Sequence, residues 1–330
     1  MNPFSWQTAG TVTEAATHKQ HPQSQLLAGG TTQLDLMKCG VFKPERLISV
    51  TQLPGMGTIA FDENTLTFGG GVLMSELENH PDCQRLAPAI YGSLWQAASP
   101  QIRNMATLAG NLRQRTRCAY YRDPATFPDC NKRSPGSGCA ALVGVTRNHA
   151  VLGGSESCVA TYPGDLAVAL MAFDAVVVVE NAQGAIRKVA IDDFYLLPGN
   201  TPDKEHDLHE DELITAIEIP QTAALKNSLY LKVRDRSSYE FAAASAAVGL
   251  VVENGVIMDV RVAVGGVATK PWRARRVEEA LRGQPFSEAL INQAAQRVTE
   301  DARPLTHNAH KITLLPRVVT RALLAAGETA

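Results

Sequence analysis

Short apolar runs along the chain alternate with segments of helical spacing, and glycine-rich turns separate them. Near the N-terminus, residues 25–28 predict a strand that stops at two glycines, and residues 31–38 predict a helix with a threonine as its cap. Residues 46–50 predict the next strand, so this segment forms a small βαβ unit. Residues 58–61 and 65–68 then predict a hairpin.

Helical spacing follows in residues 74–78 and 88–98, but between residues 113 and 160 the periodicity is lost. This stretch is rich in arginine, proline and glycine, and it contains four of the six cysteines. A loop of such length inside a compact protein is usually functional or disordered. The cysteines favour a functional loop, because a metal can order a segment that has no core of its own.

Periodicity returns with a short helix at residues 166–173 and with strands at 175–180, 185–189 and 211–220. A change of composition at residues 221–227 predicts a domain boundary.

Beyond this boundary, residues 228–234 and 242–252 predict strands, and Asn254-Gly255 predicts a tight turn into a strand at 256–265. Three helices are expected in the tail: 272–282, 287–302 and 310–326, the last with a break at Pro316. Strands followed by helices predict an α+β domain.

Composition narrows the class of protein. A chain of 330 residues that is 45% hydrophobic is long enough for two or three domains. Its formal charge of -2 favours neither nucleic acid nor an anionic membrane surface as a partner. We find no apolar run long enough to span a bilayer, and no basic and apolar leader at the N-terminus, so we expect no export signal.

The cysteines suggest a metal site. Six cysteines are too few for a disulfide scaffold in a chain of this length, and without a signal we expect them to be reduced. Cys39 and Cys83 stand alone and are interpreted as ordinary semi-buried residues. The other four have the spacing Cys-x11-Cys-x8-Cys-x18-Cys: Cys118, Cys130, Cys139 and Cys158.

That spacing matches neither a common zinc ribbon nor a ferredoxin run, so it does not choose the metal. Unrelated structural cysteines and a disulfide pair are the alternatives, and a metal site is preferred. Arginine and lysine crowd the same loop, and nearby positive charge would stabilise an anionic thiolate cluster. The competing interpretation of these basic residues is a solvated surface loop.

Two turns are candidates for binding a phosphate through backbone N–H groups. The first is Gly29-Gly30, between the first predicted strand and helix; alone, this pair favours a plain tight turn. The second is the glycine-asparagine turn at residues 107–112, directly before the cysteine loop. A phosphate site beside a thiolate cluster suggests a redox subunit with two kinds of cofactor.

The order and separation of these motifs identify a resemblance that runs nearly end to end. The chain resembles the FAD-binding medium subunits of the xanthine dehydrogenase group of molybdenum hydroxylases, and within them the periplasmic aldehyde oxidoreductase branch, which carries an additional 4Fe–4S cluster. The segments that carry the resemblance are residues 27–34, 107–112, 163–167, 212–217, 230–234 and 265–268. Two departures are Ala109, where the family often has glycine, and Tyr162-Pro163-Gly164-Asp165, where it commonly has His-Pro-Ser-Asp.

The resemblance implies an α+β fold. It consists of a two-part FAD-binding domain of the vanillyl-alcohol-oxidase (PCMH) type over residues 1–222, with the 4Fe–4S loop at 113–160. A smaller domain, similar to the CO dehydrogenase flavoprotein C-terminal domain, follows at 226–328 with an antiparallel sheet and helices.

The resemblance also implies a set of FAD-binding residues in two pyrophosphate loops and three further positions. Asp165 would bind ribityl or ribose hydroxyls, Ile214 would pack on the isoalloxazine, and Lys232 would offset the charge of reduced flavin. The alternatives are a plain strand core residue for Ile214 and a surface lysine for Lys232. The loop residues are Leu26, Leu27, Ala28, Gly29, Gly30, Thr31, Thr32, Gln33 and Leu34, then Thr107, Ala109, Gly110 and Asn111.

The implied function is electron transfer. A large subunit with a molybdenum cofactor would oxidise an aldehyde, a small 2Fe–2S subunit would pass electrons to FAD here, and an external acceptor would receive them. The chain would reach the periplasm as a folded passenger of a signal-bearing partner, with a cytoplasmic location as the alternative. A stand-alone FAD oxidase or dehydrogenase and a zinc-binding scaffold are the rival functions.

Overall fold

The computed structural model describes residues 1–328, which begin with a small parallel sheet. Its strands are β1 (Ser5–Thr8), β2 (Ser24–Leu27) and β3 (Arg46–Ser49), in the order β1-β3-β2. Helices α1 (Val12–Lys19) and α2 (Gln33–Lys38) connect them. Both strand pairs are parallel, as the βαβ prediction for β2 and β3 requires.

A five-stranded antiparallel sheet follows, in the order β4-β5-β8-β6-β7. The predicted hairpin forms its edge as β4 (Ile59–Phe61) and β5 (Thr65–Gly69), and the chain returns much later with the other strands. These are β6 (Val176–Asn181), β7 (Ile186–Ala190) and β8 (Glu212–Pro220).

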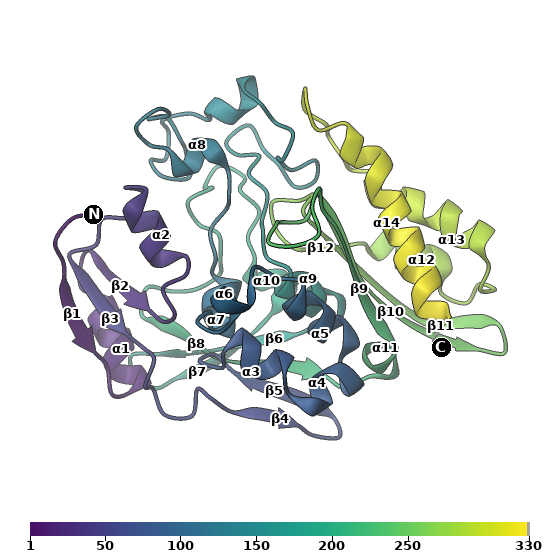
Figure 1. Ribbon diagram of the computed structural model, residues 1–330, viewed down its shortest axis with the longest axis horizontal. Helices are drawn as coiled ribbons and strands as arrows, with labels where there is room; N and C mark the ends of the chain where they lie inside the picture. The colour runs from purple at the N-terminus through teal and green to yellow at the C-terminus, as the bar shows by residue number, and fades with distance from the viewer. Residues whose placement is uncertain (329–330) are drawn as a thin grey trace.

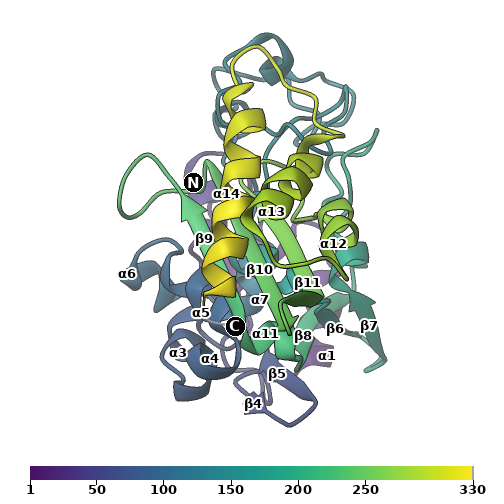
Figure 2. The same cartoon turned by 90° about the vertical axis from the view of Figure 1, so that its right-hand side faces the viewer.

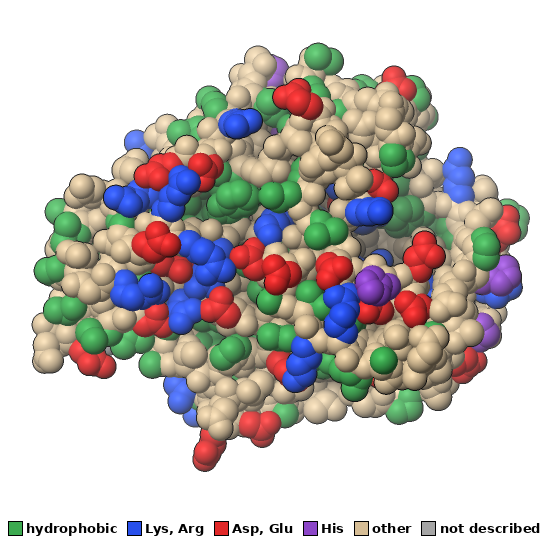
Figure 3. Space-filling model, turned by 180° about the vertical axis from the view of Figure 1, so that it is seen from behind, with side chains coloured by type: hydrophobic (Ala, Val, Ile, Leu, Met, Phe, Trp, Pro, Cys, Tyr) green, Lys and Arg blue, Asp and Glu red, His purple; other side chains and the backbone are tan. Residues whose placement is uncertain are grey.

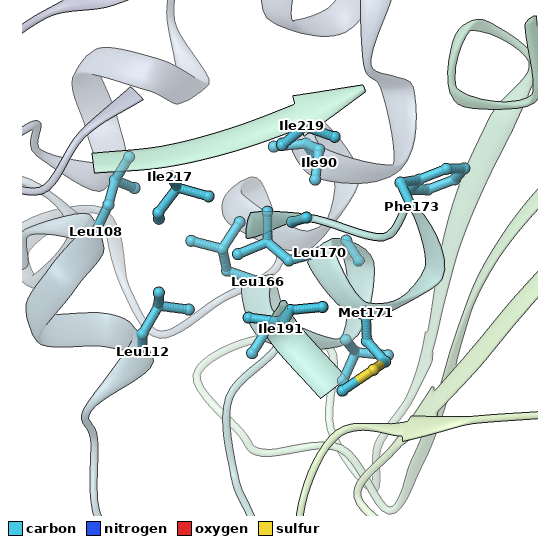
Figure 4. Close-up of a cluster of buried hydrophobic side chains, with 14 of the residues drawn as sticks. Ile90, Leu108, Leu112, Leu166, Leu170, Met171, Phe173, Ile191, Ile217 and Ile219 are labelled. Carbon is cyan, nitrogen blue, oxygen red and sulfur yellow. The ribbon is translucent and has the colours of Figure 1, made fainter. Parts of the chain in front are cut away.

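Short helices cover this sheet and build the main core. They are α3 (Met74–Glu78), α4 (Pro81–Leu86), α5 (Pro88–Trp95), α6 (Pro100–Arg103), α7 (Leu108–Leu112), α9 (Leu166–Ala172) and α10 (Ile191–Phe194). Every residue of α9 is buried, and Figure 4 shows Leu166 and Leu170 of this helix beside Leu108 and Leu112 of α7 and Ile217 of β8. Burying each such side chain stabilises the fold by about 1.5–3 kcal/mol.

The C-terminal part is a four-stranded antiparallel sheet, β12-β11-β10-β9, with helices on one face (Figure 2). After α11 (Ala223–Lys226), its strands are β9 (Ser228–Val233), β10 (Ala244–Glu253), β11 (Val256–Gly265) and β12 (Trp272–Arg273). Its helices are α12 (Arg275–Leu281), α13 (Glu288–Ala295), the 3-10 turn η2 (Gln296–Thr299) and α14 (His310–Gly327).

The cysteine loop lies at one end of the molecule, between α2 and α14 (Figure 1). It contains α8 (Ala119–Arg122), the 3-10 turn η1 (Ala140–Val143) and little other regular structure. The guanidinium of Arg133 binds the carbonyl oxygens of Tyr120 and Tyr121, each at 2.6 Å. Arg117 and Arg122 both pair with Asp35 of α2. Arg133 therefore holds the backbone of α8 in place, while Arg117 and Arg122 attach the loop to α2.

Three expectations for the tail differ from the structure. Trp272 and Arg273 are not helical; they pair with Val264 and Ala263 of β11, and the helix begins at Arg275. Pro316 does not break the last helix, which continues through it to Gly327. The second predicted helix also ends early, at Ala295, and passes into a 3-10 turn.

Candidate functional site

A large cleft of about 980 Å3 lies between the small parallel sheet and the five-stranded sheet, at the upper end of volumes typical of small-molecule sites. Both predicted phosphate turns line it, and Ile214 of β8 lines it from the sheet. The predicted FAD-binding residues that lie in its wall are Leu26, Ala28, Gly29, Gly30, Thr31, Thr32, Gln33, Thr107, Ala109, Gly110 and Ile214.

The first turn presents donors that the protein itself does not use. Among the described residues, the backbone N–H groups of Gly29, Gly30 and Thr31 have no backbone acceptor. Gly30 has φ +73°, a conformation that favours glycine. The Nε2 amide of Gln33 is buried and also lacks a partner within residues 1–328. These unpaired N–H groups make the first turn suitable for an anionic ligand.

Gly29 has a second role, because it lets the two turns approach. A Cβ atom at this position would lie 1.6 Å from the carbonyl oxygen of Met105, just before the second turn. The glycine is therefore required by contact between the two turns.

The second turn differs from the first because its amides are occupied. Leu108 N donates to Val72 O, Ala109 N to Gly70 O, and Gly110 N to the Thr107 hydroxyl that caps α7. This turn shapes the cleft wall, and the unpaired donors lie on the first turn.

Positive charge also faces the cleft. Arg113, directly after α7, is exposed there and makes no side-chain hydrogen bond or ion pair within the described residues. Lys19 of α1 lines the same cleft, and its Nζ donates to the carbonyl oxygens of His209 (3.1 Å) and Glu212 (2.9 Å). Burial and the nearby Arg113 lower the pKa of Lys19 to about 8. The pair would attract an anion.

Asp165 and Lys232 are not among the residues that line the cleft. They form a buried ion pair of 2.7 Å, and the Tyr230 hydroxyl donates to the other carboxylate oxygen at 2.6 Å. Burial raises the pKa of Asp165, although Lys232 opposes this shift. The flavin contacts expected for both residues remain predictions, since each side chain is occupied by the other.

Three further predicted residues lie behind the cleft wall. Leu27 is buried in the core of the parallel sheet, and Leu34 packs against it. The Asn111 amide donates to the sulfur of Met74 at 3.2 Å, while its oxygen is buried and unpaired within residues 1–328. These positions support the turns from behind.

The four loop cysteines line one small pocket beside α8. Cys130 and Cys139 face each other across an isolated antiparallel bridge, while Cys118 precedes α8 and Cys158 arrives from the end of the loop. All four are free thiols, so the disulfide alternative finds no support. Burial raises the pKa of Cys118 to about 12 and also raises that of Cys158.

The donor set fits a metal or an iron–sulfur cluster, because four thiols on one small pocket are the ligands that such groups take. The free volume between them is about 10 Å3, and within residues 1–328 no three ligating side chains are already arranged around a common point. The four side chains would have to turn around a bound group, which a loop with little regular structure permits.

A polar bridge joins the cleft to the thiol pocket. Arg115, in the cleft wall, pairs with Glu205, and the same carboxylate accepts from Lys132 Nζ at 2.7 Å in the wall of the thiol pocket. Burial disfavours the charged form of Glu205, but Arg115 and Lys132 outweigh it and hold its pKa below the usual value. One carboxylate therefore contacts a cation from each site.

Sequence reasoning missed Glu205 and His149, and it assigned Arg113 to the cysteine loop instead of the cleft. His149 lies 3.3 Å from the sulfur of Cys118. Neither Glu205 nor His149 belongs to a sequence motif. The excess of basic over acidic residues in the cysteine loop is the one signal that a carboxylate from another segment would have to pair with them.

Elsewhere the surface has a mixed charge. Acidic and basic side chains are interspersed on the face drawn in Figure 3, without a large area of one sign. In the part of the chain that the structure describes, no helix combines the length and apolarity needed to cross a bilayer.

Comparison with known proteins gives the family. The model described as "FAD binding domain in molybdopterin dehydrogenase" matches residues 2–222, and that of the "CO dehydrogenase flavoprotein C-terminal domain" matches residues 229–326. The aldehyde oxidoreductase FAD-binding subunit PaoB of Escherichia coli (strain K12) is 42% identical, over 99% of each chain. The glyceraldehyde dehydrogenase medium chain of Sulfolobus acidocaldarius is 24% identical, over 91% of this chain and 89% of its own.

Solved structures agree on the fold. Carbon monoxide dehydrogenase from Hydrogenophaga pseudoflava is similar with a TM-score of 0.77 at 24% identity, covering 99% of this chain and 98% of its own. Quinoline 2-oxidoreductase from Pseudomonas putida 86 gives 0.76 at 21% identity, covering 100% and 98%. The predicted fold class and family resemblance are confirmed. The chain belongs to the FAD-binding medium subunits of the xanthine dehydrogenase family of molybdenum hydroxylases.

Proposed function

We propose that this chain is the electron-transfer subunit of a molybdenum-containing aldehyde oxidoreductase, with FAD in the cleft and a 4Fe–4S cluster on the four loop thiols. The observation that carries the proposal is the convergence of Cys118, Cys130, Cys139 and Cys158 on one pocket, which Glu205 connects to the cleft. The name of the relative with 42% identity supports an aldehyde as the substrate of the complex.

The cleft residues have distinct tasks toward FAD. The free N–H groups of Gly29, Gly30 and Thr31 suit the pyrophosphate, and the guanidinium of Arg113, which forms no ion pair within the described residues, adds positive charge. Ile214 offers an apolar side chain to the flavin ring from the strand β8. When bound, FAD supplies a centre that exchanges electrons singly or in pairs.

The thiol pocket would exclude water and hold the sulfurs close to cationic side chains. Lys132 lines it, and Arg133 fixes the backbone of α8, so the loop keeps positive charge near thiolates. A 4Fe–4S cluster there would supply one-electron chemistry, which zinc does not have. The matching family models describe flavoprotein domains and no cluster. The proposal of a 4Fe–4S cluster is therefore supported by the four thiols alone.

The partners follow from the proposal. Electrons would come from 2Fe–2S centres of a small subunit, which receives them from a large molybdenum-cofactor subunit, and would leave to an external acceptor. The complex would fold and receive its cofactors in the cytoplasm, and this chain would then be exported to the periplasm bound to a partner that carries the signal. A cytoplasmic complex is the alternative.

The rival functions make different demands. A stand-alone FAD oxidase needs a substrate pocket and a catalytic base, and the sequence offers no convincing His or carboxylate pair for that role. A zinc-binding scaffold would use the thiols but would not need the cleft.

Purification of the complex tests the proposal. Large and small subunits should co-purify with this chain, and aldehyde turnover should be lost when the subunits are separated. Turnover of an aldehyde by the isolated, flavin-loaded chain would overturn the assignment as an electron-transfer subunit.

A further inference from the structure

His149 is a fifth metal-ligating type of side chain beside the four thiols. Its Nε2 atom lies 3.3 Å from the sulfur of Cys118, and only 6% of the residue is exposed. Its other ring nitrogen, Nδ1, is buried without a hydrogen-bond partner in the described residues. The ring also contacts that of Tyr120, with centroids 5.8 Å apart, but its one polar contact within residues 1–328 is with the Cys118 sulfur. A buried imidazole whose one polar partner is a sulfur indicates a role in the thiol pocket.

The location of the ring proton follows from these contacts. Nδ1 lacks a partner in the described residues whichever nitrogen carries the proton, so the contact at Nε2 decides. A metal-bound thiolate has no proton to donate, so only an N–H at Nε2 can form a hydrogen bond to the Cys118 sulfur. The Nε2–H tautomer is therefore favoured, so the ring donates to Cys118.

The backbone holds the ring in this position. His149 N donates to Thr146 O at 2.9 Å, and the Asn308 amide binds the carbonyl oxygens of His149 and Ala150, each at 3.2 Å. The anchor comes from the C-terminal part of the chain, outside the cysteine loop. A loop that rearranges around a bound group can therefore keep this donor fixed.

We propose that His149 is a positioning residue that donates its Nε2–H to the Cys118 sulfur and thereby sets the reduction potential of the iron–sulfur cluster held by the four thiols. This inference rests on the proposed function, because it presupposes the cluster. Hydrogen bonds to cluster sulfurs stabilise the more negatively charged reduced state, so they raise the potential.

Three variants of the complete, anaerobically purified complex test the inference. His149→Leu removes the donor, and His149→Gln keeps an N–H donor on a side chain of similar reach. His307→Leu is the matched control, since His307 contacts Thr146 at the same junction but contacts no sulfur. Iron and flavin contents are measured first, and the cluster potential is then measured by a redox titration followed by electron paramagnetic resonance.

His149→Leu should keep its iron and flavin and should shift the cluster to a lower potential. His149→Gln and His307→Leu should both remain near the wild-type value. An unchanged potential in His149→Leu would overturn the inference. Loss of iron from this variant to the level of Cys118→Ser would also overturn it, because His149 would then be a ligand or a structural residue.

A second measurement needs no variant. With 15N-labelled histidine in the wild-type complex, a weak nitrogen coupling to the reduced cluster and an exchangeable proton coupling are expected. A strong coupling of a direct ligand, or no coupling, would contradict the hydrogen bond. Wild-type protein that contains no iron would instead refute the proposed cluster itself, so the two failures are distinguishable.

Discussion

Gly29 and Gly57 both line the cleft, but only Gly29 lacks room for a side chain. Gly29→Ala should destabilise the protein by about 1–3 kcal/mol and lower flavin occupancy, because the new Cβ would meet the carbonyl oxygen of Met105 and separate the two turns. Gly57→Ala is the control, since nothing lies within 4 Å of its Cβ position. Urea unfolding and acid-released flavin measure both effects; equal behaviour of the two variants would contradict the close-approach argument.

The buried pair of Asp165 and Lys232 makes a second prediction at this scale. Lys232→Met should cost about 3–5 kcal/mol of unfolding free energy, because it leaves a buried carboxylate unpaired. The double variant Asp165→Asn with Lys232→Met should regain much of this loss, since it removes both charges and keeps an acceptor for Tyr230. Additive losses in a double-mutant cycle would show that the two side chains are not coupled.

At the scale of elements, local patterns predicted most strands but only half of the α-helices in residues 1–328, and they failed where contact with a distant segment determines the structure. The turn at Asn254 and Gly255 was predictable because both residues adopt positive φ, 50° and 78°. Trp272 was wrongly assigned to a helix because its pairing with Val264 is tertiary. The strand β1 and the short helices α1, α4, α6, α7, α8, α10 and α11 were not predicted.

The last helix illustrates how packing outweighs propensity. A proline inside a helix costs about 3 kcal/mol, and Pro316 was therefore expected to break it. Buried Leu315, Val319 and Leu323 each contribute about 1.5–3 kcal/mol along the face that packs on the C-terminal sheet. Their sum exceeds the cost of the proline, so the helix continues.

The bridge between the two sites makes a prediction about pH. The pKa of Glu205 is held below its usual value of 4.5 by Arg115 and Lys132, so the bridge stabilises the folded state above pH 4.5 and this contribution is lost as the pH falls through the lowered pKa. Glu205→Gln should therefore cost about 1–3 kcal/mol at pH 7, and its difference from wild type should shrink below pH 4.5.

Urea unfolding of wild type and Glu205→Gln between about pH 3 and 7 measures the difference in unfolding free energy, over a range that spans the usual glutamate pKa of 4.5. Glu279→Gln, which changes an exposed carboxylate with no ion pair in the described residues, is the control and should show neither effect. A difference between Glu205→Gln and wild type that is constant with pH would contradict the bridge.

At the scale of the whole molecule, the sequence motifs located the cleft and the thiols, but not how the two sites are joined. The glycine turns are recognisable by residue type and short spacing, and the four cysteines by their concentration in one irregular loop. Glu205 is 90 residues from Arg115 and 73 from Lys132, so no local pattern predicts either pair. Arg113 was visible in the sequence, but only the fold turns it toward the cleft.

The cleft and the thiol pocket are built from different segments, so a variant that loses the group bound at one site should keep the group bound at the other. Cys130→Ser or Cys139→Ser should remove iron but leave flavin bound, because neither cysteine lines the cleft. Flavin should also be released by acid precipitation, since the first turn has no His or Cys for a covalent link. Iron and flavin assays on the same samples check this; joint loss of both from a single cysteine variant would contradict separate sites.

The central claim is that this single chain holds both a flavin and an iron–sulfur cluster. The most direct test is the iron, acid-labile sulfide, zinc and flavin content of protein purified without air, together with single serine variants of the six cysteines. We expect about four irons per flavin, loss of iron on changing any one of Cys118, Cys130, Cys139 and Cys158, and no loss on changing Cys39 or Cys83. One zinc per flavin with no labile sulfide would contradict the claim.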